Sequence, residues 1–181
     1  RRNRLRLVPN PLDDRALHLA LTVRSSWDAR VTVVSMGPRA AEELCRRALA
    51  FGADQAILVS DTACAGADTI ATARTLAAAV TRPKEGAGTS RFLIIAGVQS
   101  PDGDTAQVPI QVASFLSIPV VPYVRSAEIT KDRLMLETIA QTGIASAQLS
   151  PADMPALLTC TDQLPALPFH CPPESVSRAV N

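Results

Sequence analysis

The chain has 181 residues, 47% of them hydrophobic and 19% charged, which is typical of one globular domain with a single core. A net charge of +1 and an aromatic content of 3% argue against a nucleic-acid partner, because the chain has neither a basic field nor stacking platforms. No apolar run approaches the roughly 20 residues of a membrane span and no signal peptide is visible, so we expect a cytoplasmic protein without membrane insertion.

In the first half of the chain, the apolar pattern predicts helices that alternate with strands. The expected elements are a helix after Pro11, a strand at 31–34, a helix at 40–51, a strand at 56–59 and a helix at 70–80. Asp13 or Asp14 can cap the first helix, because a carboxylate accepts hydrogen bonds from free N–H groups. Gly52 can end the second helix, and Asp68 can open the third.

The stretch 92–119 predicts a strand, a glycine turn at Gly97, a polar loop at 100–105 and a helix. This order is typical of a nucleotide-binding crossover in a parallel sheet, where ligands bind outside the carboxyl ends of the strands. Asp102 and Asp104 fall where the helix begins, so they can cap its N–H groups or contact a ligand there. We therefore expect the function of the chain to depend on this loop.

The remaining elements complete an α/β fold. We expect a strand at 120–124, a hairpin from 127–129 and 134–139, a strand at 155–160 and an irregular, proline-rich tail at 164–181. Alternating strands and helices predict a Rossmann-like, doubly wound parallel sheet with right-handed crossovers and a C-terminal hairpin extension. We expect residues 1–125 to form the nucleotide- or flavin-binding core, and residues 126–181 to pack on the same domain.

Motifs for catalysis are absent from the sequence. There is no GxSxG elbow, no Walker loop and no GxGxxG, so we predict no catalytic residues. Cys45 and Cys160 are expected to be buried thiols, and the scattered cysteines with only two histidines predict no metal site. Asp102 and Asp104 could serve as an acid–base pair or as metal ligands, but capping or contact with a ligand's hydroxyls or amides is favoured.

Four motifs in order resemble the beta subunits of electron transfer flavoproteins. They are Asn10-Pro11-Leu12-Asp13, the strand and turn at 31–38, the ALAFGAD segment at 48–54, and DGDTAQV at 102–108. The DGDTAQV segment resembles the form found in the electron-bifurcating subgroup, as do Ser60-Asp61 and the residues 66–69. The resemblance implies an adenine nucleotide alpha hydrolase-like fold.

The resemblance also implies an electron carrier without substrate chemistry of its own. Family beta subunits pair with an alpha subunit and bind AMP in ordinary members or a second FAD in bifurcating members. Electrons would pass between a donor and an acyl-CoA dehydrogenase-type or quinone-linked oxidoreductase. Ala106 and Val108 stand where AMP-binding members have Asn and Thr, so we expect FAD, with AMP as the alternative.

Carried over to this sequence, the family's cofactor pocket would include the start of the first helix, the strand and turn at 31–38, and the polar loop. The expected lining residues are Asn10, Pro11, Leu12, Asp13, Met36, Gly97, Val98, Gln99, Ser100, Asp102, Gly103, Asp104, Thr105, Ala106, Gln107 and Val108. The helix that begins near Gln107 would direct its N–H groups and dipole toward phosphates. Asp102 and Asp104 would accept hydrogen bonds from ribose or base donors.

Two other functions stay open at this point. A flavin-free adenine-nucleotide module could serve as a scaffold or regulatory subunit of a larger redox complex. Val98 replaces a basic residue that is usual in the family. Val98 and Ala106 distinguish this alternative from the electron carrier, because a scaffold should have a pocket too poor in polar contacts to keep a flavin. A stand-alone enzyme is disfavoured, because the SGGxDS loop of the ATP pyrophosphatases that share this broad fold is missing.

Overall fold

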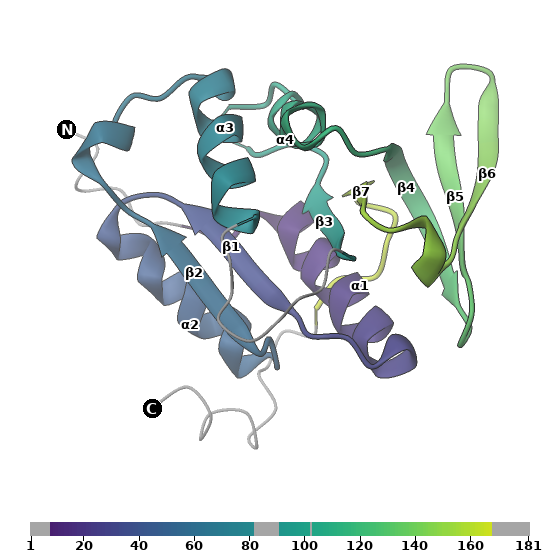
Figure 1. Cartoon of the computed structure of the whole chain (residues 1–181). Coiled ribbons are helices and arrows are strands. Elements are labelled where there is room, and N and C mark those ends of the chain that lie inside the picture. The colour runs from purple at the N-terminus through teal and green to yellow at the C-terminus, as the bar shows by residue number, and fades with distance from the viewer. Residues whose placement is uncertain (1–7, 82–90, 102, 168–181) are drawn as a thin grey trace.

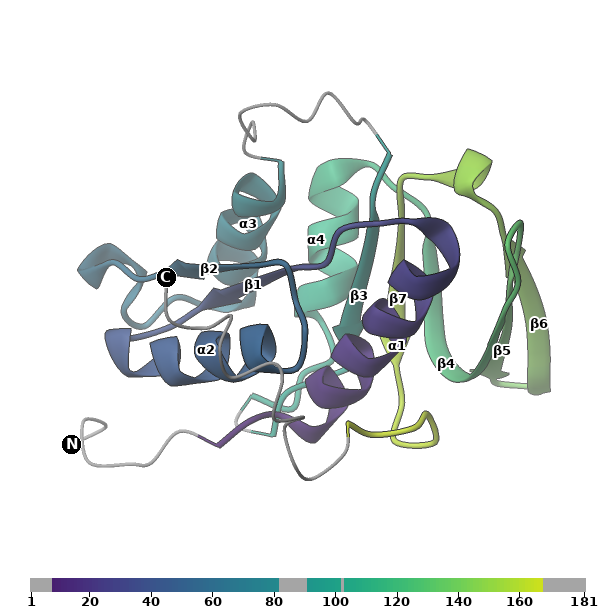
Figure 2. The ribbon, with the colours of Figure 1, turned by 90° about the horizontal axis from the view of Figure 1, so that it is seen from below.

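A computed structural model describes residues 8–81, 91–101 and 103–167 of the chain. The helices are α1 (Pro11–Trp27), α2 (Glu42–Ala50), α3 (Thr69–Val80) and α4 (Val108–Leu116), and the strands are β1 (Thr32–Met36), β2 (Gln55–Val59), β3 (Leu93–Gly97), β4 (Val120–Ile129), β5 (Leu134–Ala140), β6 (Gly143–Leu149) and β7 (Ala156–Cys160). Helices lie on both sides of the strands (Figures 1 and 2). The predicted α/β architecture, with a mostly parallel sheet between helices, is confirmed.

The last described strand, β7, lies inside the five-stranded sheet. It pairs in parallel with β3 on one side and with β4 on the other. All five of its residues are buried, as expected for a strand with neighbours on both edges and helices on both faces. The sequence predicts a strand here but not its central position, because an apolar run does not specify which strands it pairs with.

The strands of the described chain are divided between two sheets. β1 and β2 form a separate two-stranded parallel sheet, whereas β3, β7, β4, β5 and β6 form a five-stranded mixed sheet in that order. Within the described part of the chain, no strand pairs with both β1 and β3 to join the two sheets. Every residue of β1 is only half-buried, in contrast to the buried residues of β7.

The hydrogen bonds of β3 show which of its edges lies away from β7. The Val98 N–H donates to the carbonyl of Cys160, so alternate residues of β3, including Ile94 and Ala96, direct their backbone groups toward β7. The backbone groups of Leu93 and Ile95 therefore point away from β7. On that side of β3, the described strands provide no pairing partner.

Local capping chemistry sets the starts of α1 and α3. The side chain of Asn10 accepts from the N–H of Leu12 and Pro11 occupies the first turn, so the prediction that Asp13 or Asp14 caps α1 is wrong. The expected cap of α3 is confirmed, since Asp68 accepts from the N–H of Ala71. Gly52, at φ 111°, follows α2 as expected.

The predicted hairpin between β4 and β5 is confirmed as an antiparallel pair. β6 was not predicted, because its sequence, GIASAQL, consists mostly of small and polar residues without clear alternation. It pairs with β5 along its full length, from Gly143 opposite Ala140 to Leu149 opposite Leu134. Of the predicted tail at 164–181, residues 168–181 lie outside the described part of the chain.

Two apolar layers hold the five-stranded sheet. On one face, Ala16, Leu19 and Val23 of α1 pack against residues of β4, β5 and β7. On the other face, α3 and α4 pack together and against Leu157 of β7. Cys45 and Cys160 are buried as expected. Among the described residues, no helix combines the length and apolar character needed to cross a membrane.

Hydrogen exchange of the 181-residue chain tests the interrupted sheet. In β3, the amides of Ile94 and Ala96 are paired with β7 and should exchange slowly, whereas the amide of Ile95 faces the interruption and should exchange faster. In β7, Leu157 and Leu158 should both be protected, because they bond to opposite neighbours. Equal protection of all three β3 amides would show that the edge is covered.

Candidate functional site

The candidate site lies at the carboxyl ends of β3 and β7, beside the middle of β4. Gly97 is the register partner of Cys160, and Cys160 is in turn the partner of Val124. The chain leaves β3 at Gly97, forms the predicted polar loop and enters α4 at Val108. This edge of a parallel sheet is where α/β domains bind ligands.

Asn10 ties the start of α1 to this loop. Its Nδ2 donates to the carbonyl of Gln99 over 2.8 Å and to Oδ2 of Asp13 over 2.9 Å. Its Oδ1 accepts from the N–H of Leu12 as the cap of α1. One amide therefore fixes the helix start and the loop backbone together, which explains why both regions carry motif residues although they are far apart in sequence.

Asp13 completes this connection. Its Oδ1 accepts a 2.8 Å hydrogen bond from the N–H of Gly97, one of the backbone groups that point away from β7. Burial raises the pKa of the Asp13 carboxyl above its ordinary value of 3.8, although the bonds from Gly97 and Asn10 act in the opposite direction. Asp13 therefore substitutes for a strand neighbour at the end of β3.

The close approach of α1 requires a glycine at position 97. A Cβ added to Gly97 would lie 2.7 Å from Cβ of Leu12 and 2.9 Å from Oδ1 of Asp13. A real Cβ tolerates neither distance, so the helix start and the strand end can meet only because residue 97 has no side chain. Gly97 is a structural requirement of the site.

The loop then turns sharply before α4. The N–H of Asp104 donates to the carbonyl of Ser100 over 2.8 Å, and both Asp104 and Ala106 have positive φ, at 47° and 53°. The predicted cap by Asp104 is wrong, because Gln107 is the first residue before α4 and no side chain caps this helix. Asp102 lies outside the described residues.

The starts of α3 and α4 lie side by side. Thr69, the first residue of α3, donates through Oγ1 to Oε1 of Gln107 and accepts from Nε2 of Gln111, each over 3.3 Å. Oε1 of Gln111 is buried and has no hydrogen-bond partner among the described residues. A buried amide oxygen without a donor costs free energy.

The structure brings some predicted site residues together and leaves others apart. Hydrogen bonds connect Asn10 and Asp13 with Gly97 and Gln99. Met36 ends β1, which belongs to the other sheet. Val108 packs into the apolar layer between α3 and α4 and is not a polar contact.

Sequence reasoning missed Thr69 and Gln111 as site residues. Thr69 was recognised only as the start of a helix, and Gln111 lies one helical turn beyond the predicted loop. The thiol of Cys160, the register partner of Gly97, is unreactive, because burial and the neighbouring Asp13 raise its pKa to about 12 and so disfavour the thiolate.

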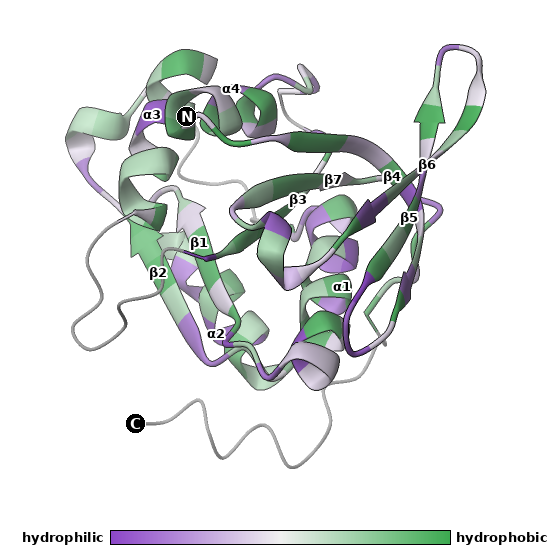
Figure 3. Ribbon diagram, turned by 45° about the vertical axis from the view of Figure 1, so that its right-hand side comes forward, coloured by the Kyte–Doolittle hydropathy of each residue, from purple (hydrophilic) through white to green (hydrophobic). Residues whose placement is uncertain are grey.

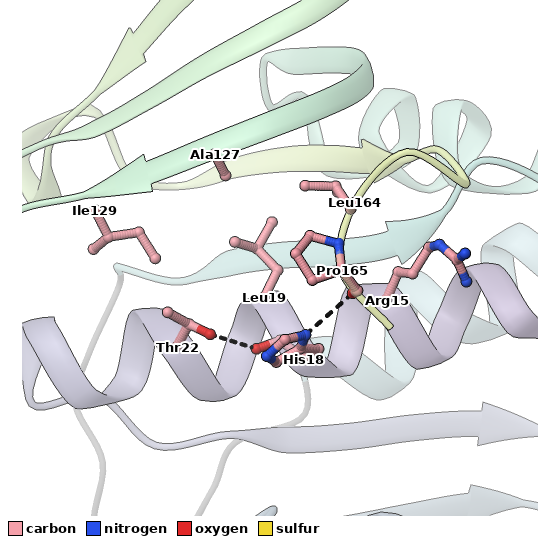
Figure 4. A pocket seen from close by; sticks show the side chains of 8 residues that line it. All are labelled: Arg15, His18, Leu19, Thr22, Ala127, Ile129, Leu164 and Pro165. Carbon is pink, nitrogen blue, oxygen red and sulfur yellow. Dashed lines mark hydrogen bonds between the residues drawn. The ribbon is translucent and has the colours of Figure 1, made fainter. Parts of the chain in front are cut away.

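A pocket with apolar walls lies elsewhere, between α1, β4 and the segment after β7 (Figure 4). It is lined by Arg15, His18, Leu19, Thr22, Ala127, Ile129, Leu164 and Pro165. Nδ1 of His18 lies 3.1 Å from the carbonyl oxygen of Pro165, so this histidine is used in holding the segment onto α1. None of the predicted site residues lines this pocket.

The groups at the sheet edge suit an adenine nucleotide better than a metal ion. Among the described residues, no cluster of three His, Cys, Asp or Glu could hold a metal. The start of α4, which no described side chain caps, offers N–H groups and a positive dipole end to a phosphate. The described residues therefore fit a nucleotide.

Sequence comparison identifies relatives of the chain. The profile of the electron transfer flavoprotein domain matches residues 2–177. The electron transfer flavoprotein subunit beta of Thermoanaerobacterium thermosaccharolyticum is 43% identical over 157 residues, which cover 87% of this chain and 57% of that protein. The caffeyl-CoA reductase-Etf complex subunit CarD of Acetobacterium woodii is 40% identical over 158 residues, with the same two coverages.

A third relative has a different name. The protein FixA of Azotobacter vinelandii is 40% identical over 155 residues, which cover 84% of this chain and 53% of that protein. The chain thus spans little more than half the length of the curated relatives that it matches.

Replacing Gly97 by Ala tests the close approach of α1 and β3. The added methyl group must displace Leu12 or Asp13, so we expect Gly97→Ala to lower the free energy of unfolding by about 1–3 kcal/mol. Gly103→Ala is the matched control in the same loop, because its Cβ would meet only Ser100 Oγ at 3.5 Å. Denaturant unfolding measures both, and equal stability of the two variants would contradict the assignment.

The buried carboxyl of Asp13 gives a prediction about pH. Because its pKa is raised in the folded state, its contribution to stability is full below the ordinary value of 3.8 and is lost as the pH rises through the raised pKa. Asp13→Asn cannot titrate, so the stability of the native chain relative to this variant should fall as the pH rises above 3.8. Thermal unfolding across this range would contradict the prediction if the difference stayed constant.

Proposed function

Because the chain belongs to the electron transfer flavoprotein family, we propose that it forms the nucleotide-binding part of a beta-type subunit of an electron carrier. In this role it binds a flavin or adenine nucleotide and passes electrons without chemistry on a substrate. The carrier works between an electron donor and an acyl-CoA dehydrogenase-type or quinone-linked oxidoreductase.

The observation that carries this proposal is the anchored loop at the end of β3. Asn10 and Asp13 hold Gly97 and Gln99, so the loop that leads into α4 has a fixed starting point. Fixed backbone groups bind a ligand without first losing conformational freedom, which favours tight retention of a cofactor. The uncapped start of α4 supplies the place for a phosphate.

FAD is the cofactor that the loop favours. Ala106 carries no polar side-chain atom, and Val108 is packed between α3 and α4, so neither provides the contacts expected for AMP. We extend the proposal to an electron-bifurcating carrier with one FAD at this loop.

The partner is an electron transfer flavoprotein alpha subunit. Relatives of this chain are named as subunits, which supports a function carried out by an assembly. In this proposal, the second redox centre, the other FAD of the heterodimer, belongs to the alpha subunit.

Identification of the bound nucleotide tests this function. The subunit is purified with its alpha partner, its absorbance spectrum is recorded, and the nucleotides are released with acid and identified. We expect two FAD per heterodimer. One FAD with one AMP would show an ordinary carrier and contradict our interpretation of Ala106 and Val108.

A third result would remove the carrier function from this chain. If its loop holds neither FAD nor AMP, the chain is a flavin-free scaffold or regulatory subunit. The residues 97–108 include no lysine or arginine, which is the feature that favours this second candidate. Gly97→Ala locates the binding site, because a nucleotide that binds at this loop should be lost from that variant.

A further inference from the structure

Arg125 lies in an irregular part of β4, beside the candidate site. Figures 1 and 3 show β3, β7 and β4 side by side, in the order that their pairing gives. Val124 is the register partner of Cys160, which in turn pairs with Gly97 at the end of β3. Because neighbouring strands lie about 4.8 Å apart, this part of β4 is roughly 10 Å from the loop that leaves β3.

Two irregularities shape β4 at this point. Its register with β7 shifts between Val121 and Val124, and its register with β5 shifts between Val124 and Ser126. Tyr123 has a positive φ of 53°, which is rare for a bulky side chain, and its N–H donates over 2.8 Å to Oγ1 of the buried Thr159. Bulges of this kind re-aim side chains and are frequent beside functional sites.

The bulge places Arg125 on the face of the sheet that α4 covers. Val124 and Ala127 both pack in the apolar cluster with α1, on the opposite face. The residues between them therefore lie on the other face, where α4 packs with Leu157 and Val120. Because α4 follows the loop that leaves β3, it begins at the same edge of the sheet. Arg125 and the start of α4 thus share one face and one edge.

The guanidinium group of Arg125 has no hydrogen-bond or ion-pair partner within the described chain. Its Nε is buried and makes no hydrogen bond, and none of the ion pairs among the described residues includes Arg125. A buried donor of a cationic group costs free energy without an acceptor, so this position favours a ligand that brings an anion. Arg15, at the start of α1, is already used, since it donates to the carbonyls of Pro11 and Asp162.

The loop itself offers no positive side chain to a phosphate. The stretch 97–108 contains Asp102 and Asp104 but no lysine or arginine. The N–H groups at the start of a helix provide about half a positive charge, whereas a diphosphate group carries more negative charge than this. A cation from another element is therefore required, and the planar fork of donors of an arginine suits phosphate oxygens.

Resting on the nucleotide site proposed above, we propose that Arg125 is the cation of this site and that its guanidinium group binds the phosphates of the nucleotide. The bulge of β4, fixed by the hydrogen bond from Tyr123 to Thr159, holds the backbone that carries this side chain. Arg125 supplies the positive charge that Val98 cannot supply from the loop. FAD gains more from this contact than AMP, because its diphosphate carries more negative charge than a single phosphate.

Titration of the heterodimer with FAD tests this role. The bound nucleotides are first released, and the binding step that Gly97→Ala abolishes is assigned to the loop. We expect Arg125→Gln to weaken this step roughly 10-fold to 100-fold, because a charge-assisted hydrogen bond is lost, and Arg125→Lys to restore part of the affinity. Arg133→Gln is the matched control and should change nothing, since it removes the same charge from the exposed turn between β4 and β5.

The dependence of affinity on salt separates a contact with phosphate from a structural role. The affinity of the native heterodimer for FAD should fall as the salt concentration rises, and that of Arg125→Gln should fall less steeply, because one screened charge pair is gone. Equal affinity of Arg125→Gln and native protein would overturn the contact and leave the nucleotide site intact. A loss of affinity with an unchanged salt dependence would also overturn it.

Thermal unfolding of the nucleotide-free heterodimer examines whether Arg125 instead pairs with Glu137 on the neighbouring strand. Ser126, next to Arg125, is the register partner of Glu137. An arginine without an ion pair loses none on substitution, so Arg125→Gln and Glu137→Gln should each leave the melting temperature unchanged. Equal decreases in both variants would assign Arg125 to Glu137 and overturn the proposal. If the native heterodimer binds neither FAD nor AMP at the loop, the nucleotide site and the contact with Arg125 are overturned together.

Discussion

The hydrogen bond from the N–H of Gly97 to Asp13 is the contact on which the site depends. It joins the end of β3 to the start of α1 at a point where none of the described strands pairs with β3 on that side. Three requirements follow from this hydrogen bond. Residue 97 must be glycine, the carboxyl of Asp13 must be buried, and Asn10 must share its amide between Asp13 and Gln99.

This contact gives the NPLD motif a structural role. Asn10 and Asp13 were expected to line a cofactor pocket, and that expectation stays a prediction. Their described contacts are with the protein itself, since one caps α1 and both hold the backbone after β3. A motif far from the loop in sequence can therefore determine the shape of the loop, because α1 starts at the same edge of the sheet where β3 ends.

The elements that the sequence predicts well are those with local signals. Apolar periodicity and Asp68 place α3, and the strand–glycine–loop pattern places β3 and α4. Pairing between strands has no local signal, so the position of β7 between β3 and β4 and the break between β1 and β3 were not predicted. β6 was missed for a related reason, because its small residues bury little surface and show no alternation.

What the candidate site leaves unsatisfied determines the kind of ligand that it could take. Among the described residues, no side chain caps the start of α4, and no donor reaches the buried amide oxygen of Gln111. Unpaired N–H groups at a helix start favour an anion such as a phosphate. A nucleotide at this loop is therefore the proposal that these groups support, and it depends on the loop staying where Asn10 and Asp13 hold it.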